Sequence, residues 1–466
     1  MTSNSLNIPF FSTADETIDT AFRIAVGDFT SNIQLWKGGL LENPEPCIIA
    51  GLGYKKPWTR DAAFNTWYAG GIIAPDIAKN TMLSVLSKDS GKIKISGEYW
   101  DKIIWVTGAW KYYLYTGDQQ FLKMVLEASK NTLEELENDE YDNADGLFRG
   151  GACFQDGVAG YPDKFGDPAG KFCGINQWPK NNPKKAYSNG FGVPCKALST
   201  NCLYYNAYKL ISEISEELNI KEDFTFKQKA TKLKIAINKH FWSEEKGHYR
   251  YLLDAEDDKE RQEGLGHAFA ILFGIADKKQ IHSIMKNQYL TKHGISCVWP
   301  PYERYCDKQY KHFPRHSGTI WPQVNTAWVE ACEMTGNHSL AIKELQMLAT
   351  KAVRDSHFFE IYHPITGKPY GGRQEHPEYG GLHEWESCSR QTWCATGYIN
   401  MIFKSLLGIN FTKEGLRLTP HLPHKIEKIS LKNIHYRKAI LNITITQKDK
   451  PIFIPKDCAG TIEILG

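Results

Sequence analysis

The sequence predicts a mainly α-helical protein, an (α/α)6 barrel with a small C-terminal β element. Three observations lead to this fold class. Apolar residues recur at helical spacing through most of the chain up to about residue 408, short turns alternate with long loops, and strand-like alternation begins after Gly408. With 466 residues, of which 42% are hydrophobic, the chain has room for a large core.

About twelve helices are predicted. The clearest covers residues 199–218, where Leu203, Ala207 and Leu210 recur on one face. Another covers residues 339–353 and follows a capping sequence. The remaining predicted helices cover residues 14–29, 61–72, 75–87, 99–116, 119–137, 222–241, 264–275, 278–287, 319–335 and 388–406.

Short turns join several of these helices into pairs. Gly117 with Asp118, and Gly336 with Asn337, are sequences in which a glycine ends one helix and a capping residue begins the next. Long loops separate the pairs and usually carry function. Short turns on one side and long loops on the other are typical of a ring of six helical hairpins. The long loops cover residues 31–60, 141–195, 288–318 and 354–387.

The end of the chain has a different pattern. Leu441, Ile443 and Ile445 alternate with polar neighbours, and Ile462 and Ile464 repeat the alternation near the C-terminus. A segment of about 55 residues does not easily form an independent core. We therefore expect a barrel domain at residues 1–410 and a β-strand subdomain at 411–466 packed against it.

Composition excludes several function classes. The net charge of +3, with both signs interspersed, gives no basic patch for nucleic acid. Eleven cysteines occur without Cys-x-x-Cys pairs or histidines at ligand spacing, so no metal site, cofactor or disulfide framework is expected. Neither a signal peptide nor a run of ~18 apolar residues is present, which favours a cytoplasmic protein without a membrane partner. The oligomeric state does not follow from the sequence.

The segment 359–373 contains one carboxylate, Glu360, between aromatic residues. A turn-forming Pro-x-Thr-Gly follows at 364–367, and the segment ends with Gly-Gly-Arg at Arg373. Turn chemistry of this kind places a side chain on an exposed loop. A carboxylate among aromatic rings suits a sugar, and 12% of the chain is aromatic, with 13 Trp. The alternative is a salt-bridged surface Glu.

Five further clusters lie in long loops or at helix starts beside them. Arg60 and Asp61 can bond sugar hydroxyls while a neighbouring Trp stacks, although Asp61 could instead only cap its helix. Asp156 lies in a glycine-rich loop between aromatic residues, where the alternative is a simple Asp-Gly turn. The clusters are Trp58, Arg60 and Asp61; Glu98, Trp100 and Asp101; Asp156; Trp321, Gln323 and Asn325; and Glu384, Trp385 and Glu386.

Glycoside hydrolysis needs two carboxyl groups that flank one bond. A barrel open at one end brings distant loops to one mouth, so Asp156 and Glu360 can face each other. Burial and mutual repulsion would raise the pKa of whichever serves as the acid. Competing carboxylates remain, and if Glu386 is the base, Glu360 becomes a binding residue. These competitors are Glu98, Asp101, Glu384 and Glu386.

With these loops assembled, the chain resembles the helical-barrel glycoside hydrolases, especially glycoside hydrolase family 63 and the trehalase-like enzymes. Their base lies in a segment like Glu-x-Tyr-x-Pro-x-Thr-Gly, which matches Glu360 and the residues to Gly367. Their acid is an Asp in a Gly-rich loop, which Asp156 matches in position. Residues 319–325 are similar to the Trp-Pro-x-x-Asn block of these barrels.

Two segments resemble other families of the same clan. Residues 58–61 look more like the glucoamylase-type family 15, whose acid and base are both Glu and whose Arg-Asp pair binds the terminal sugar. Residues 416–423 are similar to the closing β domain of rhamnosidases and helical-barrel disaccharide phosphorylases. The resemblance therefore implies the clan and not the substrate.

The resemblance implies an exo-acting, inverting O-glycosyl hydrolase for α-linked oligosaccharides or glycosides. Asp156 would protonate the glycosidic oxygen, and Glu360 would activate water on the opposite face of the sugar. The substrate-binding residues would be Trp58, Arg60, Asp61, Trp100, Asp101, Trp321, Gln323, Asn325, Arg373, Trp385 and Glu386.

Two alternatives remain open on the same barrel. A disaccharide phosphorylase would need a basic cluster for phosphate, for which His312, Arg315 and His316 are candidates. A sugar isomerase would need paired histidines, with His267, His293 and His316 as candidates, and a carbohydrate-binding protein without catalysis would need neither.

Overall fold

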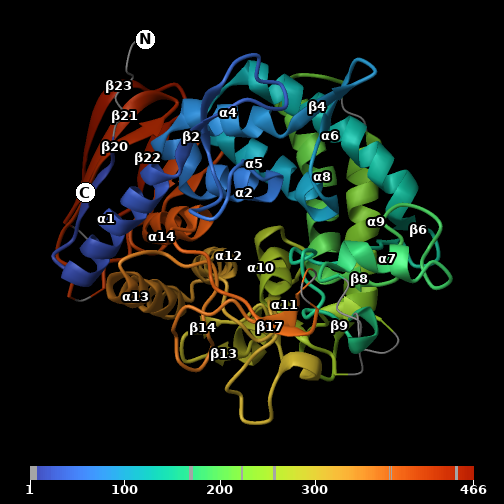
Figure 1. Ribbon diagram of the computed structural model, residues 1–466. Coiled ribbons are helices and arrows are strands. Elements are labelled where there is room, and N and C mark those ends of the chain that lie inside the picture. Colours follow the sequence, from blue (N-terminus) through green and yellow to red (C-terminus); the bar gives the residue numbers. More distant parts are fainter. Residues whose placement is uncertain are drawn as a thin grey trace.

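The computed structural model describes residues 8–166, 172–221, 224–254, 259–376, 378, 380–423, 425–446 and 450–466. Within this part of the chain, six helices form a closed inner ring in which each packs against the next and the last against the first (Figure 1). Most residues of these helices are buried. They are α2 (Thr59–Asn65), α5 (Tyr99–Thr116), α8 (Leu198–Glu217), α10 (Gly264–Leu272), α12 (Pro322–Met334) and α14 (Thr392–Ser405).

Six amphipathic helices of the described chain surround this ring and turn their apolar sides inward. Since each inner helix alternates in sequence with an outer one, the inner helices all run in the same direction. The predicted (α/α)6 barrel is therefore confirmed. The outer helices are α1 (Glu16–Ser31), α4 (Pro75–Ser84), α6 (Gln119–Glu140), α9 (Phe224–Phe241), α11 (Lys278–Asn287) and α13 (His338–Asp355).

Several helix boundaries differ from the sequence prediction for local reasons. The helix predicted at 319–335 begins at Pro322, a residue that suits the first position of a helix. The helix predicted at 388–406 begins at Thr392, because Arg390 has a positive φ of 50° and the Gln391 N–H donates to the Phe358 carbonyl at 2.9 Å. The helix predicted at 61–72 continues beyond α2 through a π-helical turn (Thr66–Gly70) into α3 (Gly71–Ile73). The short helix α7 (Trp178–Asn181) was not predicted.

The turns and loops lie at opposite ends of the barrel. Gly117 ends α5 with a φ of 73°, as a left-handed cap requires, and Asp118 caps α6. The long loops at the other end carry short antiparallel ribbons that the sequence pattern did not predict. The paired strands are β2 (Ile33–Trp36) with β3 (Glu45–Ile48), β4 (Leu86–Asp89) with β5 (Lys92–Ile95), β6 (Tyr141–Asp142) with β7 (Leu147–Phe148), β8 (Lys196–Ala197) with β11 (Leu252–Leu253), β9 (Trp242–Ser243) with β10 (His248–Tyr249), β12 (Gln262–Glu263) with β15 (Val298–Trp299), β13 (Leu290–Thr291) with β14 (Gly294–Ile295), and β16 (Arg373–Glu375) with β17 (Leu382–Glu384).

The C-terminal strands form two sheets beside the helices. One has the order β1-β20-β21-β23 and the other β18-β19-β22. Strand β21 alternates buried Leu441, Ile443 and Ile445 with partly exposed residues, as the sequence predicts. The N-terminal strand β1, which was not predicted, pairs with β20 and so belongs to this sheet. The strands are β1 (Phe10–Ser12), β18 (Asn410–Phe411), β19 (Gly415–Leu418), β20 (Ile429–Tyr436), β21 (Lys438–Ile445), β22 (Ile452–Pro455) and β23 (Ala459–Leu465).

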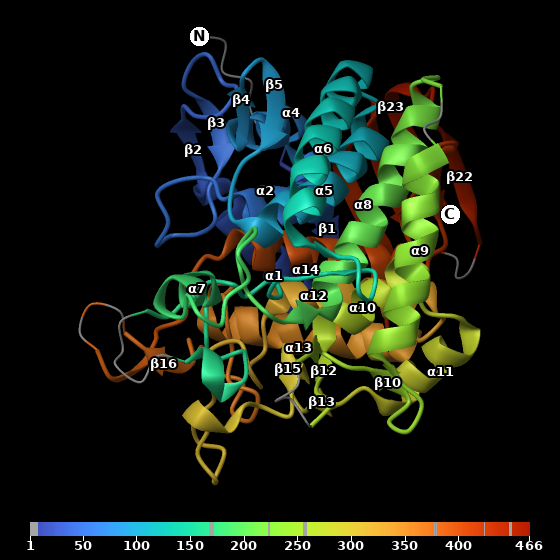
Figure 2. The same cartoon turned by 90° about the vertical axis from the view of Figure 1, so that its right-hand side faces the viewer.

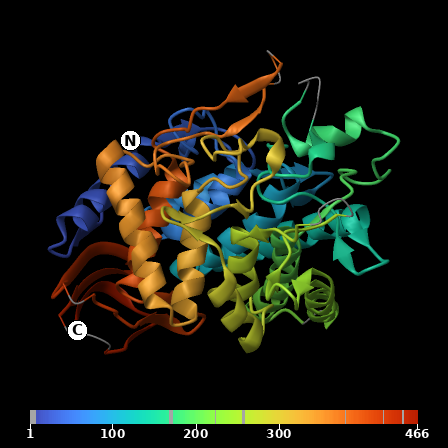
Figure 3. The same ribbon diagram turned by 90° about the horizontal axis from the view of Figure 1, so that it is seen from below.

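The sheets share one apolar core with the barrel. Figure 3 shows the C-terminal strands directly beside the helical ring, and Figure 2 shows them on the side opposite the loops that carry β4, β5, α7 and β16. The division between residues 410 and 411 stays a prediction.

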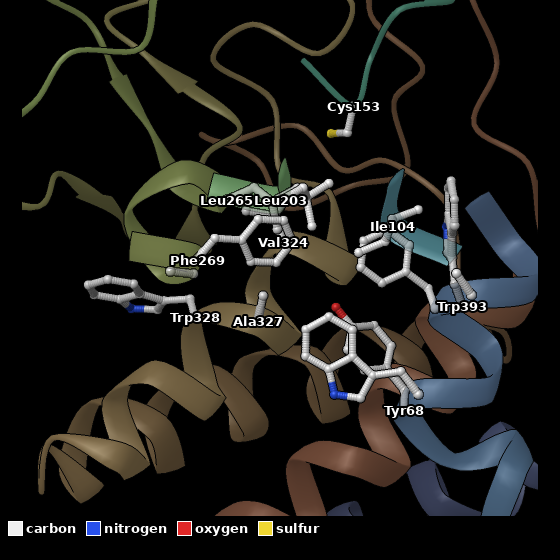
Figure 4. Packing of buried hydrophobic residues seen from close by; sticks show 14 of the residues in the cluster. Tyr68, Ile104, Cys153, Leu203, Leu265, Phe269, Val324, Ala327, Trp328 and Trp393 are labelled. Carbon is white, nitrogen blue, oxygen red and sulfur yellow. The ribbon is translucent and has the colours of Figure 1, made fainter. Parts of the chain in front are cut away.

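Large side chains fill the middle of the barrel. Figure 4 shows Tyr68, Phe269 and Ala327 pointing into this region, with Cys153 beyond them towards the loops. These residues are fully buried, and the Tyr68 hydroxyl donates to the Gln323 carbonyl at 2.9 Å. The barrel is therefore a packed core, open to ligands only from its ends.

Candidate active site

The candidate site lies at the end of the barrel where the inner helices begin, and Arg60 is at its centre. Arg60 lies in the first turn of α2 and is only 9% exposed. Its Nη1 donates to the Cys153 carbonyl and lies 3.4 Å from Asp156 Oδ1, while its Nε lies 3.6 Å from Asp101 Oδ1. Burial lowers the pKa of Arg60, but Asp101, Asp156 and Asp61 raise it by more, so the guanidinium stays charged.

Asp156 lies in the glycine-rich loop that follows β7. The loop turns beside it, where the Gly157 N–H donates to the Phe154 carbonyl at 3.0 Å. The Asp156 side chain is 41% exposed, and its Oδ2 lies 3.8 Å from His316 Nε2. Burial raises the pKa of Asp156, but Arg60 and His316 lower it by more, so its pKa lies well below the ordinary value. Without a bound substrate Asp156 is therefore ionised.

Glu360 lies in the loop between α13 and α14 and is 4% exposed. Its backbone N–H donates to the Cys388 carbonyl at 2.8 Å, which fixes the segment beside the start of α14. The Tyr54 hydroxyl donates to Glu360 Oε1 at 3.4 Å, and Arg315 Nη2 lies 4.0 Å from Oε2. Burial raises the pKa of Glu360, Arg315 lowers it, and the charge of Asp156 raises it further, for a net increase.

Asp156 and Glu360 thus come from loops about 200 residues apart, and the charge of Asp156 raises the pKa of Glu360. Arg60 lies 3.4 Å from Asp156 and Arg315 lies 4.0 Å from Glu360, and each arginine lowers the pKa of both carboxyl groups. The sequence prediction that a barrel mouth gathers these two carboxylates is consistent with this geometry.

Two further carboxylates lie next to Arg60. Asp61 is 4% exposed, burial raises its pKa, and its Oδ1 has no hydrogen-bond partner among the described residues. Asp101 is 1% exposed and accepts a hydrogen bond from Gln155 Nε2 at 2.9 Å, and burial raises its pKa to about 7. The base of the site is therefore rich in buried groups that can bond hydroxyls.

Aromatic rings form the walls. The Trp321 ring lies 6.0 Å from the Arg60 guanidinium and packs against Trp393 with centroids 5.2 Å apart. The Trp385 ring lies 5.5 Å from the Arg315 guanidinium. Trp58, which directly precedes α2, is partly exposed under Lys56 at 4.1 Å. Gln323 donates to Cys153 Sγ at 3.9 Å and so lies behind the residue that binds Arg60.

Four of the residues predicted to bind substrate have other surroundings. Trp100 is fully buried between Phe64 and Phe269, with ring centroids 6.1 and 6.5 Å away. Asn325 donates to Glu344 Oε2 at 2.7 Å, on the side of the outer helix α13.

The other two predicted binding residues, Arg373 and Glu386, lie on or beside the ribbon β16–β17. Arg373 Nε donates to Glu384 Oε2 at 3.0 Å across the ribbon β16–β17. Glu386 is exposed and follows this ribbon. Between the two candidate bases, the burial and the arginine contacts distinguish Glu360.

The sequence prediction omitted several residues of the site. Tyr54 and Gln155 lie in predicted loops, but hydroxyl and amide side chains in loops carry no spacing signal. Arg315 was considered only for phosphate, whereas its Nη1 donates to the Gly371 carbonyl at 2.9 Å and its Nη2 faces Glu360. His316 is fully buried with a φ of 63°, and burial lowers its pKa to about 4, so its ring is neutral at pH 7.

The histidines proposed for other functions are held by structural bonds. His312 Nδ1 lies 2.7 Å from Glu384 Oε2 on the exposed ribbon, away from His316. The ring nitrogens of His267 contact Gln288 Oε1 at 2.5 Å and the Tyr249 carbonyl at 2.8 Å. His293 Nε2 lies 3.0 Å from the Ile365 carbonyl. Neither a phosphate cluster of all three basic residues nor a histidine pair in the cleft is formed by these side chains.

Within the described residues, no cluster of His, Cys, Asp and Glu has the arrangement of a metal site. In the same ranges, none of the helices has the length and apolar character needed to cross a bilayer.

A family model described as the mannosylglycerate hydrolase MGH1-like glycoside hydrolase domain matches residues 58–379. A second model, the C-terminal domain of glycosyl hydrolase family 65, matches residues 409–464. No curated protein sequence matches the chain.

Solved structures share the fold at low identity. A sialidase matches with a TM-score of 0.69 and 12% identity over 96% of this chain and 40% of its own. The GH78 family rhamnosidase of Bacillus sp. GL1 has a TM-score of 0.56 and 15% identity over 98% of this chain and 43% of its own. The chain thus spans less than half the length of these two proteins.

A third structure is matched over its whole length. The GH63 mannosylglycerate hydrolase from Thermus thermophilus, in complex with Tris and D-glycerate, has a TM-score of 0.58 and 12% identity, over 82% of this chain and 100% of its own. These identities support the fold alone.

Proposed function

Because the chain belongs to the family of the mannosylglycerate hydrolase MGH1-like glycoside hydrolase domain, we propose that it is an exo-acting, inverting O-glycosyl hydrolase of α-linked oligosaccharides or glycosides. The observation that carries the proposal is the pair Asp156 and Glu360, two carboxyl groups from distant loops, the first beside Arg60 and the second beside Arg315. Two carboxyl groups on either side of one bond are what glycoside hydrolysis requires.

In this mechanism Asp156 donates a proton to the glycosidic oxygen as the bond to the anomeric carbon breaks. Glu360 removes a proton from a water molecule, which attacks the anomeric carbon from the opposite face and inverts it. Arg60 and Arg315 stabilise the ionised carboxylates that flank the cationic transition state.

The electrostatics of the site without substrate set a condition on these roles. Arg60 and His316 hold Asp156 ionised, whereas burial favours a protonated Glu360. Asp156 can act as the acid only if the bound sugar displaces water from its exposed edge and so raises its pKa. The reverse assignment, with Glu360 as acid and Asp156 as base, is the competing mechanism that these pKa directions favour.

The packed core beneath the site supports exo action. The packed core closes the barrel below Cys153, so a sugar chain that enters from the mouth ends there (Figure 4). Arg60 and Asp61 at this closed end suit the hydroxyls of a terminal sugar, and Trp321 and Trp385 suit its apolar faces. We propose the same contact role for Trp58 and Arg373 at the rim.

The other predicted binding residues would support the residues that contact the sugar and would not contact it themselves. Asp101 contacts Arg60 directly, and Gln323 contacts Cys153, whose carbonyl binds Arg60. Trp100 supports them from the core, Asn325 holds α12 against α13, and Glu386 remains at the exposed rim as the competing base.

The decisive experiment is a panel of aryl α-glycosides, α-linked disaccharides and an α-mannosyl glycerate, followed by NMR of the first-formed anomer. The mannosyl glycerate is included because the Thermus hydrolase is described by that activity and holds D-glycerate. The expected product of an α-glycoside is the β anomer. A first-formed α anomer would contradict the proposed mechanism, and sugar release that depended on added phosphate would identify a phosphorylase.

A further inference from the structure

His316 is a buried polar residue of the mouth whose ring nitrogens the fold does not use. The ring is fully buried. It stacks on Phe154 with centroids 5.7 Å apart, and it lies tilted against Trp321 with centroids 4.5 Å apart. Aromatic contacts of this kind bury the imidazole without providing a hydrogen-bond partner for either of its nitrogens.

Neither ring nitrogen of His316 has a hydrogen-bond partner among the described residues. Buried polar groups in proteins are nearly always paired, so an exception calls for an explanation. The nearest charged group is Asp156, whose Oδ2 lies 3.8 Å from His316 Nε2. This distance is too long for a hydrogen bond, but an approach of about 1 Å would form one. The Asp156 side chain is 41% exposed, which leaves it free to make this shift.

The backbone holds the imidazole ring in a fixed place beside Asp156. His316 has a φ of 63°, in the left-handed region that residues with side chains rarely adopt. The turn is anchored by the Gly318 N–H, which donates to the Val298 carbonyl at 2.8 Å. On the other side, a Cβ at Gly157 would lie 3.2 Å from His316 Cδ2, so the loop that carries Asp156 packs closely on the ring. His316 is therefore a fixed point against which Asp156 can be aligned.

The charge state of the ring suits such a contact. Burial lowers the pKa of His316 to about 4, and Arg315 and Arg60 add to the decrease while Asp156 opposes it. A neutral imidazole can donate an N–H to Asp156 in both of its protonation states, because a carboxylic acid keeps an oxygen that accepts. An imidazolium would instead favour the carboxylate and oppose proton uptake. The neutral ring can therefore orient Asp156 without fixing its charge.

We propose that His316 is a positioning residue for Asp156: when a substrate displaces water from the mouth, His316 Nε2–H donates to Asp156 Oδ2 and aligns the carboxyl group for proton transfer. Arg60 Nη1 lies 3.4 Å from the other oxygen, Oδ1, so each carboxyl oxygen faces one donor. The inference applies whichever of Asp156 and Glu360 is the acid, and its catalytic consequence rests on the proposed hydrolase activity.

The first test needs no substrate. Nitrogen NMR of the full chain with isotope-labelled histidine at pH 7 should show His316 as a neutral ring with its proton on Nε2, because the ionised Asp156 favours a proton on the nearer nitrogen. The His316 signals are identified by their proximity to the rings of Phe154 and Trp321. A neutral ring with its proton on Nδ1, or a charged ring, would overturn the proposal even in an active hydrolase.

Variants test the contact in catalysis. His316→Phe should lower kcat by about 10²-fold and leave KM nearly unchanged, because a misplacement of about 1 Å can cost that much. His316→Gln should recover most of the loss, since its amide reaches the position of Nε2. His316→Asn should not, since its amide reaches only the position of Nδ1. His282→Phe, at an exposed position of α11, is the matched control.

A double variant distinguishes positioning from packing. Combined with Asp156→Asn, His316→Phe should cause no further loss of kcat, because both changes act through the same carboxyl group. A further loss as large as that of His316→Phe alone, or equal recovery by Gln and Asn, would overturn the proposal. A wild type that hydrolyses nothing in the glycoside panel would remove the proposed activity alone. The NMR measurement then decides on the contact, as it does if the variants do not fold.

Discussion

The two ends of the barrel differ in the balance between their acidic and basic side chains. At the mouth, Asp61, Asp101 and Asp156 surround Arg60, so carboxylates outnumber the cation that they share. At the far end, where the inner helices end, the lining of a cavity holds three lysines and three glutamates, so these charges balance. An excess of carboxylates makes the affinity for protons depend on what is bound, which suits acid–base chemistry.

The largest expected effect is at the mouth. Asp156→Asn and Glu360→Gln should each lower kcat by about 10²–10⁴-fold, because each removes a group that transfers a proton. Steady-state kinetics on the best substrate of the panel measures this, with circular dichroism as a check of folding. Glu386→Gln is the matched control, since Glu386 is exposed. A large loss in Glu386→Gln with a mild one in Glu360→Gln would make Glu386 the base.

Arg60→Met should affect both activity and stability. Removing one partner of a buried ion pair costs about 3–5 kcal/mol. Without the guanidinium, the pKa values of Asp156 and Asp101 in the folded variant rise above those in the unfolded chain. The folded variant then binds more protons than the unfolded one. Its free energy of unfolding therefore falls as pH rises from about 4 to 8. Melting temperatures across this range measure the effect, and Arg23→Met, at an exposed pair with Glu16, should behave like the wild type. A pH-independent difference would contradict the shared-charge description.

Tyr54→Phe should have a smaller effect on the pH profile. The Tyr54 hydroxyl bonds Glu360 Oε1 at 3.4 Å and lowers the pKa of that carboxyl group. Its loss raises the pKa, so if Glu360 is the base, the acidic limb of kcat/KM moves to higher pH, by about half a unit. Tyr310→Phe, at an exposed ring, is the control. A limb that does not move, or moves to lower pH, would exclude Glu360 as the base.

Asn325→Ala should change stability and leave substrate binding alone. The variant leaves Glu344, which is 3% exposed, without the amide donor at 2.7 Å, at a cost of about 1–3 kcal/mol. Thermal unfolding and KM together measure the effect. A raised KM with an unchanged melting temperature would return Asn325 to the substrate-binding residues.

The sequence predicted the barrel well because its signal is periodic. In the described part of the chain, six nearly all-buried helices alternate with six amphipathic ones, and glycines such as Gly117 mark the turns between them. The ribbons of the long loops were missed because two-residue strands have no period to detect. Strand β1 was missed because its partner β20 is more than 400 residues away.

The site was predictable only in part for a similar reason. Arg60, Asp156 and Glu360 lie in motifs with recognisable turn chemistry, and the fold brings them together. Arg315 and Tyr54 contact Glu360 only through tertiary packing, which one sequence does not reveal. The burial that separates Glu360 from Glu386 is likewise a property of the folded chain.

The central claim, that Asp156 is the acid and Glu360 the base, is tested most directly by comparing leaving groups. Rates of Asp156→Asn and Glu360→Gln are measured on an alkyl glycoside and on the matching dinitrophenyl glycoside, whose leaving group needs no protonation. The account predicts that Asp156→Asn recovers most of its activity on the dinitrophenyl substrate and that Glu360→Gln stays impaired on both. Recovery by Glu360→Gln instead would contradict it and establish the reverse roles.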